Sequence, residues 1–344
     1  MAYSTIPKST SYFNTKLYSG TGAIQTVSGV GFEPSWIWTK SRTNAGNHQV
    51  TDQVRGLTKY IRPNATNAED TKTNAITAVN SDGFVLGADS SNDINASGQT
   101  YASWNWKANG SGSANSDGSI NSTVSVDTTS GFSIVSYTGT GSNATVGHGL
   151  GVAPSMIITK SLVATQEWCV YHKSLGATKY LFLNETSAEQ TGSVYWQDTA
   201  PTSSVFSIGA SGPTNSTSAM IAYCFSEIQG FSKFGLYEAN GNSDGPFIYT
   251  GFKPAFVMIK AKGQTESWYI LDNKRPGYNT NNYYLNPNTT SAEGTSTTLA
   301  TTLCSNGFKI NNADTSMNTS GQGYIYMAFG QPIVSTNGDI ATAR

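Results

Sequence analysis

The chain has 344 residues, of which only 12% are charged, and its formal net charge is −1. This composition excludes the basic surface with which proteins hold nucleic acids or anionic membranes. It also contains no run of about 18 apolar residues that would predict a membrane-spanning helix. We therefore expect neither a nucleic acid nor a membrane as a partner.

After a short arm, residues 1–17, the same pattern occurs three times along the chain. Each copy opens with a tyrosine and a glycine-rich turn, continues with a proline and an apolar strand that ends in lysine, and places a large ring fourteen residues after the proline. Internal repeats of this kind determine the architecture of a fold. The recurring positions are Tyr18, Tyr137 and Tyr237; Pro34, Pro154 and Pro254; Lys40, Lys160 and Lys260; His48, Trp168 and Trp268.

The similarity continues to the end of each copy. Asn64 and Glu69 of the first copy align with Asn184 and Glu189 of the second. Their expected counterparts in the third copy are Asn286 and Glu293, which come two and four residues late. The third copy is therefore predicted to carry insertions in the loop 278–290.

The spacing between the three prolines is 120 and then 100 residues. This is longer than the period of about 20 to 50 residues in solenoid repeats and matches a small domain. We predict an N-terminal arm at 1–17, β-sandwich repeats at 18–108, 131–229 and 230–344, the last with a C-terminal tail, and a flexible linker at 109–130. The prediction of a linker is based on the Gly, Ser and Asn content of residues 109–130. The second junction, 226–232, is short and should fix its two neighbours.

Short runs of strand-forming residues between turn residues predict an all-β protein. The strand after each proline is apolar at consecutive positions, as in Trp36, Ile37 and Trp38, which indicates a sheet covered on both faces or an interface. We expect three tandem antiparallel β-sandwich domains of the jelly-roll or concanavalin-like type. The lysine that ends this strand is interpreted as a cap that blunts edge pairing.

Four stretches of the chain resemble a repeated domain of tailed-bacteriophage virion proteins that is common in marine phages. They are Tyr137–Lys160, Val54–Tyr60, Asn80–Gly87 with Tyr101–Lys107, and Tyr326–Gln331. The resemblance implies a structural, tail-fibre-like virion component with jelly-roll or concanavalin-like domains, on the tail or the capsid surface. It implies no catalytic act, and it implies a homotrimer. The arm 1–17 would then bind other virion proteins.

Few residues predict chemistry. His48 occupies the place of two tryptophans, which favours a packing ring over a ligand. Glu69, Glu189 and Glu293 are solitary in their repeats, whereas glycoside hydrolysis requires two carboxylates. We expect no enzyme, no cofactor and no metal site. The acidic run Asp89–Asn95 offers oxygen atoms to calcium, but a solvated turn explains it as well.

Aromatic residues in polar loops are candidates for glycan binding, because their rings combine an apolar face with a polar edge. The candidates are Tyr195, Trp196 and Asp198 in the second repeat, and Tyr278, Tyr283 and Tyr284 in the enlarged loop of the third. Both groups differ between copies, as functional loops on a constant scaffold do. The alternative is that these rings fill clefts between domains or subunits.

Two functions remain open at this stage. The protein is either a tail-fibre or spike-like adhesin that binds a host surface glycan, or a capsid-decorating or tail-assembly protein that binds other virion proteins. Three similar domains in one chain also permit a pseudo-threefold monomer in place of a trimer.

Overall fold

The computed structural model describes residues 4–89, 93–275, 279 and 282–333. Among these residues, every pairing between named strands is antiparallel, and the helices are single turns of three or four residues. The prediction of an all-β protein built from antiparallel sheets is confirmed.

The first repeat places a four-stranded sheet, in the order β1-β9-β3-β4, against a three-stranded sheet, β2-β8-β7. A two-stranded ribbon, β5-β6, extends from it toward the second repeat. The elements are η1 (Ser9–Ser11), β1 (Phe13–Ser19), β2 (Gln25–Ser28), β3 (Trp36–Ser41), β4 (Gln49–Asp52), β5 (Lys59–Tyr60), β6 (Asp70–Thr71), β7 (Ile76–Asn80), β8 (Gly83–Leu86) and β9 (Thr100–Trp106).

The second repeat keeps this order as β12-β19-β14-β15 and extends it at both edges into an eight-stranded sheet. Its small sheet is the pair β13-β18. The elements are β10 (Ser113–Asn115), β11 (Ser122–Asp127), β12 (Phe132–Thr138), β13 (Ala144–Gly147), β14 (Met156–Ser161), β15 (Cys169–His172), β16 (Lys179–Phe182), β17 (Gln190–Thr191), α1 (Ser193–Trp196), β18 (Val205–Ile208), α2 (Gly212–Asn215) and β19 (Ala219–Phe225).

The third repeat repeats the order once more as β20-β28-β22-β23, with the small sheet β21-β27-β26 and the pair β24-β25. The elements are β20 (Ser232–Glu238), β21 (Phe247–Tyr249), β22 (Phe252–Ala261), β23 (Tyr269–Asp272), β24 (Tyr283–Tyr284), β25 (Gly294–Thr295), η2 (Thr297–Leu299), β26 (Thr301–Cys304), β27 (Gly307–Ile310), α3 (Thr315–Asn318) and β28 (Gly323–Pro332).

The structure differs from the predicted segment boundaries at both connections. Residues 109–130, predicted as a flexible linker, contain β10 and β11, and β11 pairs with β12 along six residues. Val124 of β11 is buried against the second repeat, so the Gly and Ser content concealed a strand. The predicted arm, 1–17, is also part of the fold: β1 begins at Phe13, and Ile6 is buried in the central core.

The middle strand of each large sheet is covered on both faces, as its continuous apolar sequence predicts. Trp36 and Trp38 of β3 point into a core at the centre of the molecule, while Ile37 between them points toward the small sheet of its own repeat. The same alternation occurs in β14 and β22, and all six residues of β3 and of β14 are buried. In each repeat, one face of the large sheet therefore packs on the small sheet of the same repeat, and the other face of the large sheet is also apolar.

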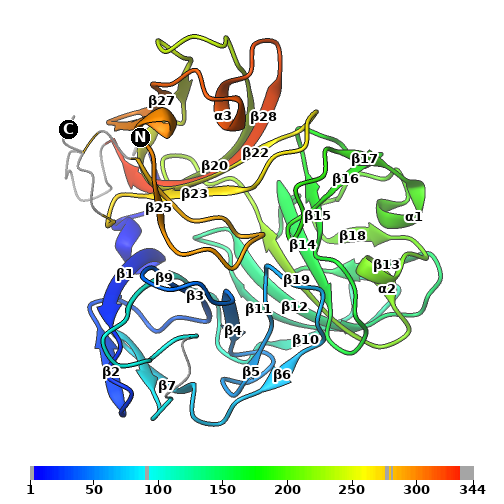
Figure 1. The fold of residues 1–344 in the computed structure, drawn as a ribbon. Helices are drawn as coiled ribbons and strands as arrows, with labels where there is room; N and C mark the ends of the chain where they lie inside the picture. Colours follow the sequence, from blue (N-terminus) through cyan, green and yellow to red (C-terminus); the bar gives the residue numbers. More distant parts are fainter. Residues whose placement is uncertain (1–3, 90–92, 276–278, 280–281, 334–344) are drawn as a thin grey trace.

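These second faces meet in one central core that belongs to all three repeats. Figure 1 shows three lobes, drawn in blue to cyan, green, and yellow to red, arranged around this centre. Aromatic contacts cross every seam between lobes: ring centroids are 5.8 Å apart for Trp36 and Phe225, 6.0 Å for Phe225 and Phe329, and 5.5 Å for Phe13 and Phe256. The repeats therefore form one pseudo-threefold unit and do not each enclose a complete core.

We expect the three repeats to unfold together and no single repeat to fold alone. A separated second repeat, residues 107–229, would expose the row Ile158, Tyr223 and Phe225 to water, and apolar exposure on this scale destabilises a small domain. Urea unfolding of the whole chain, followed by tryptophan fluorescence and by far-ultraviolet circular dichroism, should give coincident single transitions. A separated repeat with dispersed amide NMR signals would contradict this expectation.

Candidate functional site

Backbone hydrogen bonds close the three repeats into a ring. At each seam, the loop between the two ribbon strands of one repeat (β5-β6, β16-β17 or β24-β25) donates an amide to the next repeat, and the next repeat returns one. The closure is cyclic, because the third repeat bonds to the first as the first bonds to the second. The bonds are Glu69 N to Leu162 O (2.9 Å), Glu189 N to Lys262 O (2.7 Å) and Glu293 N to Arg42 O (2.9 Å), returned by Gln166 N to Thr66 O (3.1 Å), Glu266 N to Thr186 O (2.9 Å) and Gly46 N to Thr290 O (2.8 Å).

The recurring large ring also bonds across the seams. Trp168 Nε1 donates to Arg62 O at 2.9 Å, and Trp268 Nε1 donates to Phe182 O at 3.0 Å. His48 takes the same place, with Nε2 at 3.0 Å from Asn286 O. Its Nδ1 accepts from the indole of Trp38, which leaves the proton on Nε2. His48 is therefore a structural ring with both nitrogen atoms engaged.

An asparagine holds the backbone amide of each of these rings. Asn64 Oδ1 accepts from His48 N, and Asn184 Oδ1 accepts from Trp168 N, both at 2.8 Å. In the third repeat the acceptor of Trp268 N is Asn288, at 3.0 Å. The expected counterpart, Asn286, was therefore wrong by two residues, because the insertion in the third repeat lies entirely before this asparagine.

Both ring nitrogen atoms of the other two histidines also form hydrogen bonds. His172 Nε2 lies 3.2 Å from Tyr326 O, and its Nδ1 accepts from Ser174 N. His148 is bonded in the same manner to Thr202 O and Leu150 N. Burial lowers the pKa of His172 to about 4 and lowers the pKa of His148 and His48 as well. All three histidines are therefore neutral structural groups near pH 7.

Lys40, Lys160 and Lys260 do not cap sheet edges in solvent, because all three are fully buried at the seams. Lys160 Nζ donates to Thr66 O of the first repeat at 3.0 Å, and Lys260 Nζ donates to Thr186 O of the second at 3.2 Å. Burial lowers the pKa of each lysine to about 8. Lys160 and Lys260 thus join main-chain carbonyl groups of two repeats, whereas the hydrogen bonds of Lys40 go to Ser41 O and Asn44 O in its own repeat.

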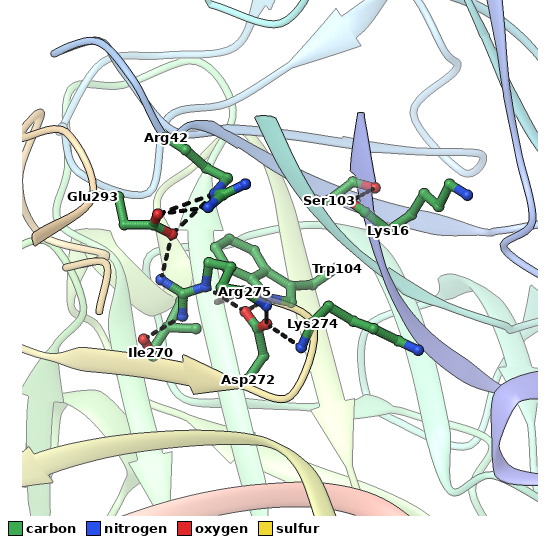
Figure 2. Close-up of polar contacts among 9 residues, drawn as sticks. All are labelled: Lys16, Arg42, Ser103, Trp104, Ile270, Asp272, Lys274, Arg275 and Glu293. Carbon is green, nitrogen blue, oxygen red and sulfur yellow. Dashed lines mark hydrogen bonds and ion pairs between the residues drawn. The ribbon is translucent and has the colours of Figure 1, made fainter. Parts of the chain in front are cut away.

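Buried ion clusters occupy two of the three seams. Figure 2 shows the cluster between the third and first repeats: Arg275 contacts Asp272 at 2.7 Å and Glu293 at 3.4 Å, and Arg42 reaches Glu293 from the first repeat at 2.8 Å. The indole of Trp104 donates to Asp272 at 3.1 Å. Burial opposes ionisation of Asp272, but Arg275 outweighs it and holds the pKa of this carboxyl below its usual value.

The seam between the first and second repeats has the same construction, with Arg55 between Asp52 and Glu69 and with Tyr223 donating to Asp52 at 2.7 Å. At the seam between the second and third repeats, His172 and Leu175 stand in the places of the aspartate and the arginine. The carboxylates that recur in sequence, Glu69 and Glu293, are thus structural ion-pair partners.

An open cavity of about 330 Å³ lies at the seam between the third and first repeats. A shallower hollow of about 270 Å³ adjoins it and shares Asn14 and Lys274 with it. The cavity is lined by Ser9, Thr10, Phe13, Asn14, Lys253, Pro254, Ala255, Asn273, Lys274, Asn279, Leu303, Gly330 and Gln331, and the hollow by Asn14, Thr15, Lys16, Leu17, Gly29 and Lys274. This lining contains lysines and amides and neither aspartate nor glutamate.

The residues predicted in the second repeat do not form one exposed aromatic surface. Trp196, on the single turn α1, is buried against Tyr171, so its ring has no face for a sugar. Tyr195 stacks on Tyr180 with ring centroids 3.7 Å apart and is partly exposed. Asp198 is exposed in a left-handed backbone conformation. The interpretation of Trp196 as a glycan platform is therefore corrected to core packing.

In the third repeat, Tyr278 lies outside the described residues. Tyr283 and Tyr284 form β24, which pairs with β25, and both are partly buried. Tyr284 packs against the core of its repeat, with its ring centroid 5.5 Å from that of Tyr269. Tyr284 therefore packs within its own repeat and not in a cleft between domains, and Tyr283 stays a candidate.

A pair of exposed rings that was not predicted from the sequence lies on the outer face of the third repeat's small sheet. Phe247 and Tyr249 of β21 are 47% and 58% exposed, while Ile248 between them is buried. Phe247 lies over Gly307, since a Cβ there would stand 2.9 Å from the edge of its ring. The corresponding residues are Thr26 and Ser28 in the first repeat and Thr145 and Gly147 in the second, so a comparison of the repeats would have found this pair.

A polar cleft of about 430 Å³ lies in the same repeat as this aromatic pair. Asn311 lines the cleft, and its side chain donates to Thr302 on the neighbouring strand β26. Asn311 comes two residues after Lys309, which is opposite Phe247 in the sheet and is paired with the exposed Asp244 at 2.5 Å. The lining consists of Ser243, Thr297, Thr298, Asn311, Asn312, Ala313 and Asp314. Phe247 is therefore nearer than Tyr249, which is opposite Gly307, to the end of β27 where hydroxyl and amide groups line the cleft.

The described part of the chain contains neither a cluster of metal ligands nor a helix that could span a membrane. No three His, Cys, Asp or Glu residues gather there as ligands for a metal ion. Asp89, from the run considered for calcium, is buried and paired with Lys72 at 2.9 Å, and residues 90–92 lie outside the description. Nor do these residues include a helix with the length and apolar character needed to cross a bilayer.

A family model matches residues 8–332, and its description is domain of unknown function DUF7483. The chain belongs to this family. The DUF7483 model runs through all three repeats, which agrees with a structural unit that cannot be divided between them. No curated protein and no solved structure gives a significant match.

We expect Arg275→Leu to destabilise the protein by about 3–5 kcal/mol, because it removes the guanidinium group from the buried carboxylate of Asp272. Adding Asp272→His, which recreates the His172 and Leu175 arrangement of the second repeat, should recover part of the loss. Asp244→Asn, which breaks an ion pair at an exposed carboxylate, is the control and should cost no more than about 1 kcal/mol. Urea unfolding measures all three, and equal losses for Arg275→Leu and Asp244→Asn would contradict the buried role.

We also expect the buried lysines to contribute more stability as the pH increases from about 8 toward 10. Their pKa is near 8 in the folded protein and near 10.5 when unfolded, so their side chains bind more protons in the unfolded chain over this interval. Buried thiols and tyrosines act in the opposite direction, the thiols of Cys169 and Cys224 from about pH 9 and the tyrosines above pH 10, because burial raises their pKa. The free energy of unfolding, measured at pH 7.5 to 9.5 in wild type and Lys160→Met, should rise less in the variant. An identical rise in both would contradict the assignment.

Proposed function

We propose that the protein is a structural virion module of a tailed phage that acts as a tail-fibre-like or spike-like adhesin for a host surface glycan. The virion assignment rests on the resemblance of Tyr137–Lys160 and the other matching stretches to phage virion proteins. The same resemblance supports a location on the tail or capsid surface and a fold of three jelly-roll or concanavalin-like repeats. Attachment of the N-terminal residues to other virion proteins, and a homotrimer, belong to the same proposal.

The observation that carries glycan binding is the exposed pair Phe247 and Tyr249, on a repeat that also contains the polar cleft. A sugar ring has an apolar face, which stacks on aromatic rings, and a rim of hydroxyl groups, which needs amide and hydroxyl partners. Residues two apart on a strand lie about 6.6–6.8 Å apart on one face, so both rings can contact one saccharide chain. The buried scaffold beneath them is rigid, and a rigid surface loses little entropy on binding.

The geometry of the ring favours a non-catalytic role for the groups that recur in the repeats. Most of these groups serve the seams: His48, His172, Lys160 and Lys260 bond to the neighbouring repeat, and Glu69 and Glu293 belong to the seam ion clusters. His148 and Lys40 are bonded within their own repeats. The residues that differ between repeats lie on the outside. Recognition by the outer face of one repeat, on a scaffold that the three repeats share, is the arrangement of a binding module.

We expect Phe247→Ala and Tyr249→Ala each to weaken adsorption of the purified protein to host cells, and the double variant to lose about tenfold or more in affinity for the glycan. Both rings are exposed, so the variants should keep the wild-type unfolding transition. Ile24→Ala is the matched control, because Ile24 is 74% exposed in the first repeat and lies away from the cleft. Glycan-array binding and cell adsorption measure the effect.

Location in the virion decides between this function and capsid decoration or tail assembly. Labelling of the protein at the tip of the tail supports an adhesin, whereas subunits at capsid lattice points would overturn it. Unchanged adsorption by the Phe247 and Tyr249 double variant would remove the aromatic pair from the binding face.

A further inference from the structure

The three seams of the ring offer an internal comparison, because corresponding residues stand at each of them. At the seam between the second and third repeats, Glu227 follows the last strand of one repeat and lies between Lys173 and Lys233. The ammonium group of Lys233 is 3.2 Å from this carboxylate. Burial opposes ionisation of Glu227, but the two lysines outweigh it and lower its pKa. This seam therefore contains a carboxylate site that the chain fills with its own side chain.

At the seam between the third and first repeats, the same three places are occupied by amides. Gln331 corresponds to Glu227, Asn273 to Lys173 and Asn14 to Lys233, counted from the matching strands β28, β23 and β1. All three line the open cavity. The seam is not crossed by a connecting segment, whereas residues 107–131 and 226–232 cross the other two. Among the described residues, an amide therefore stands at this seam where the seam between the second and third repeats has its carboxylate.

Lysines surround this open seam. Lys253 and Lys274 line the cavity, and Lys16 and Lys274 line the adjoining hollow. Figure 2 shows the side chains of Lys16 and Lys274 extending to the same side of the ion cluster. Two carboxylates close to Lys274 and Lys16 have other partners: Asp272 pairs with Arg275, and Asp82 accepts two backbone amides while Lys16 acts on it through charge. The lining thus has positive charge together with amide groups.

We infer that this seam cavity binds a carboxylate-bearing sugar, a uronic acid residue, with the ammonium groups of Lys16 and Lys274 facing the carboxylate and the amides of Asn273 and Gln331 facing the hydroxyl groups. The inference rests on the proposed glycan binding and assigns an acidic polysaccharide as its substrate class. The cavity borders the small sheet that carries Phe247 and Tyr249: Leu303 lines the cavity, and the next residue, Cys304, pairs with Gly307 opposite Tyr249.

The test compares a short oligogalacturonate with its fully methyl-esterified form, which is the same sugar without the charge. Calorimetric titration of the full chain should show about five- to tenfold tighter binding of the acid at low salt, and added salt should reduce this preference. Lys16→Gln and Lys274→Gln should each lower the preference for the acid. Gln331→Glu, which places a carboxylate where the second seam has Glu227, should abolish it.

Lys179→Gln is the control, because Lys179 is a partly exposed lysine of the second repeat paired with Glu189. It should leave the preference for the acid unchanged. Equal binding of acid and ester by the wild type, or an unchanged preference in Lys16→Gln and Lys274→Gln, would overturn the inference. Displacement of the oligogalacturonate by polyglutamate at equal carboxylate concentration would also overturn it, since the site would then not select a sugar.

This experiment tests the aromatic pair and the seam cavity separately as binding sites. Phe247→Ala with Tyr249→Ala should weaken the acid and the ester equally and leave their ratio unchanged. Ester binding that depends on the rings, without a preference for the acid, supports the proposed function and removes the seam site. A preference for the acid that survives without any effect of the rings supports the seam site and removes the aromatic face.

Discussion

The structure depends on one constraint: the middle strand of every repeat is apolar on both faces and must be covered twice. The small sheet of the same repeat covers one face, and only the other two repeats can cover the second. Trp36 of the first repeat accordingly meets Tyr223 and Phe225 of the second. Three such faces, each needing a partner, close into a ring around one core. The buried lysines, the recurring rings and the ion clusters then form hydrogen bonds with many of the polar groups that this closure removes from water.

Much of this arrangement could be predicted from the sequence where the signal is local. The run Trp36, Ile37 and Trp38 predicts a strand covered on both faces, and the alignment of His48 with Trp168 predicts a packing ring. Closure of the ring could not be predicted, because the acceptors of these groups are main-chain carbonyls more than eighty residues away. The strand β11 was hidden because its serines and threonines match a linker in composition, while its buried face depends on the pairing partner β12.

The candidate site shows the same division between local and long-range information. Trp196 looked like a binding residue because its neighbours in sequence are polar, yet a single helical turn directs its ring into the core. Phe247 and Tyr249 looked like an ordinary strand, and their exposure follows from the edge position of β21 in a sheet with solvent on its outer face. The seam cavity has no local signal, since its lining comes from both ends of the chain. It results from the way a linear chain closes a threefold ring with only two connections.

The bonds that the recurring rings make across the seams end on backbone carbonyls, not on side chains. A main-chain acceptor is present whatever residue stands there, so mutation at the accepting position does not remove the bond. The donor is nearly as tolerant, because the imidazole of His48 serves where the other repeats use an indole. Duplicated repeats joined in this way are free to diverge in sequence while their assembly persists. Each copy can therefore acquire its own outer surface without compensating changes in its neighbours.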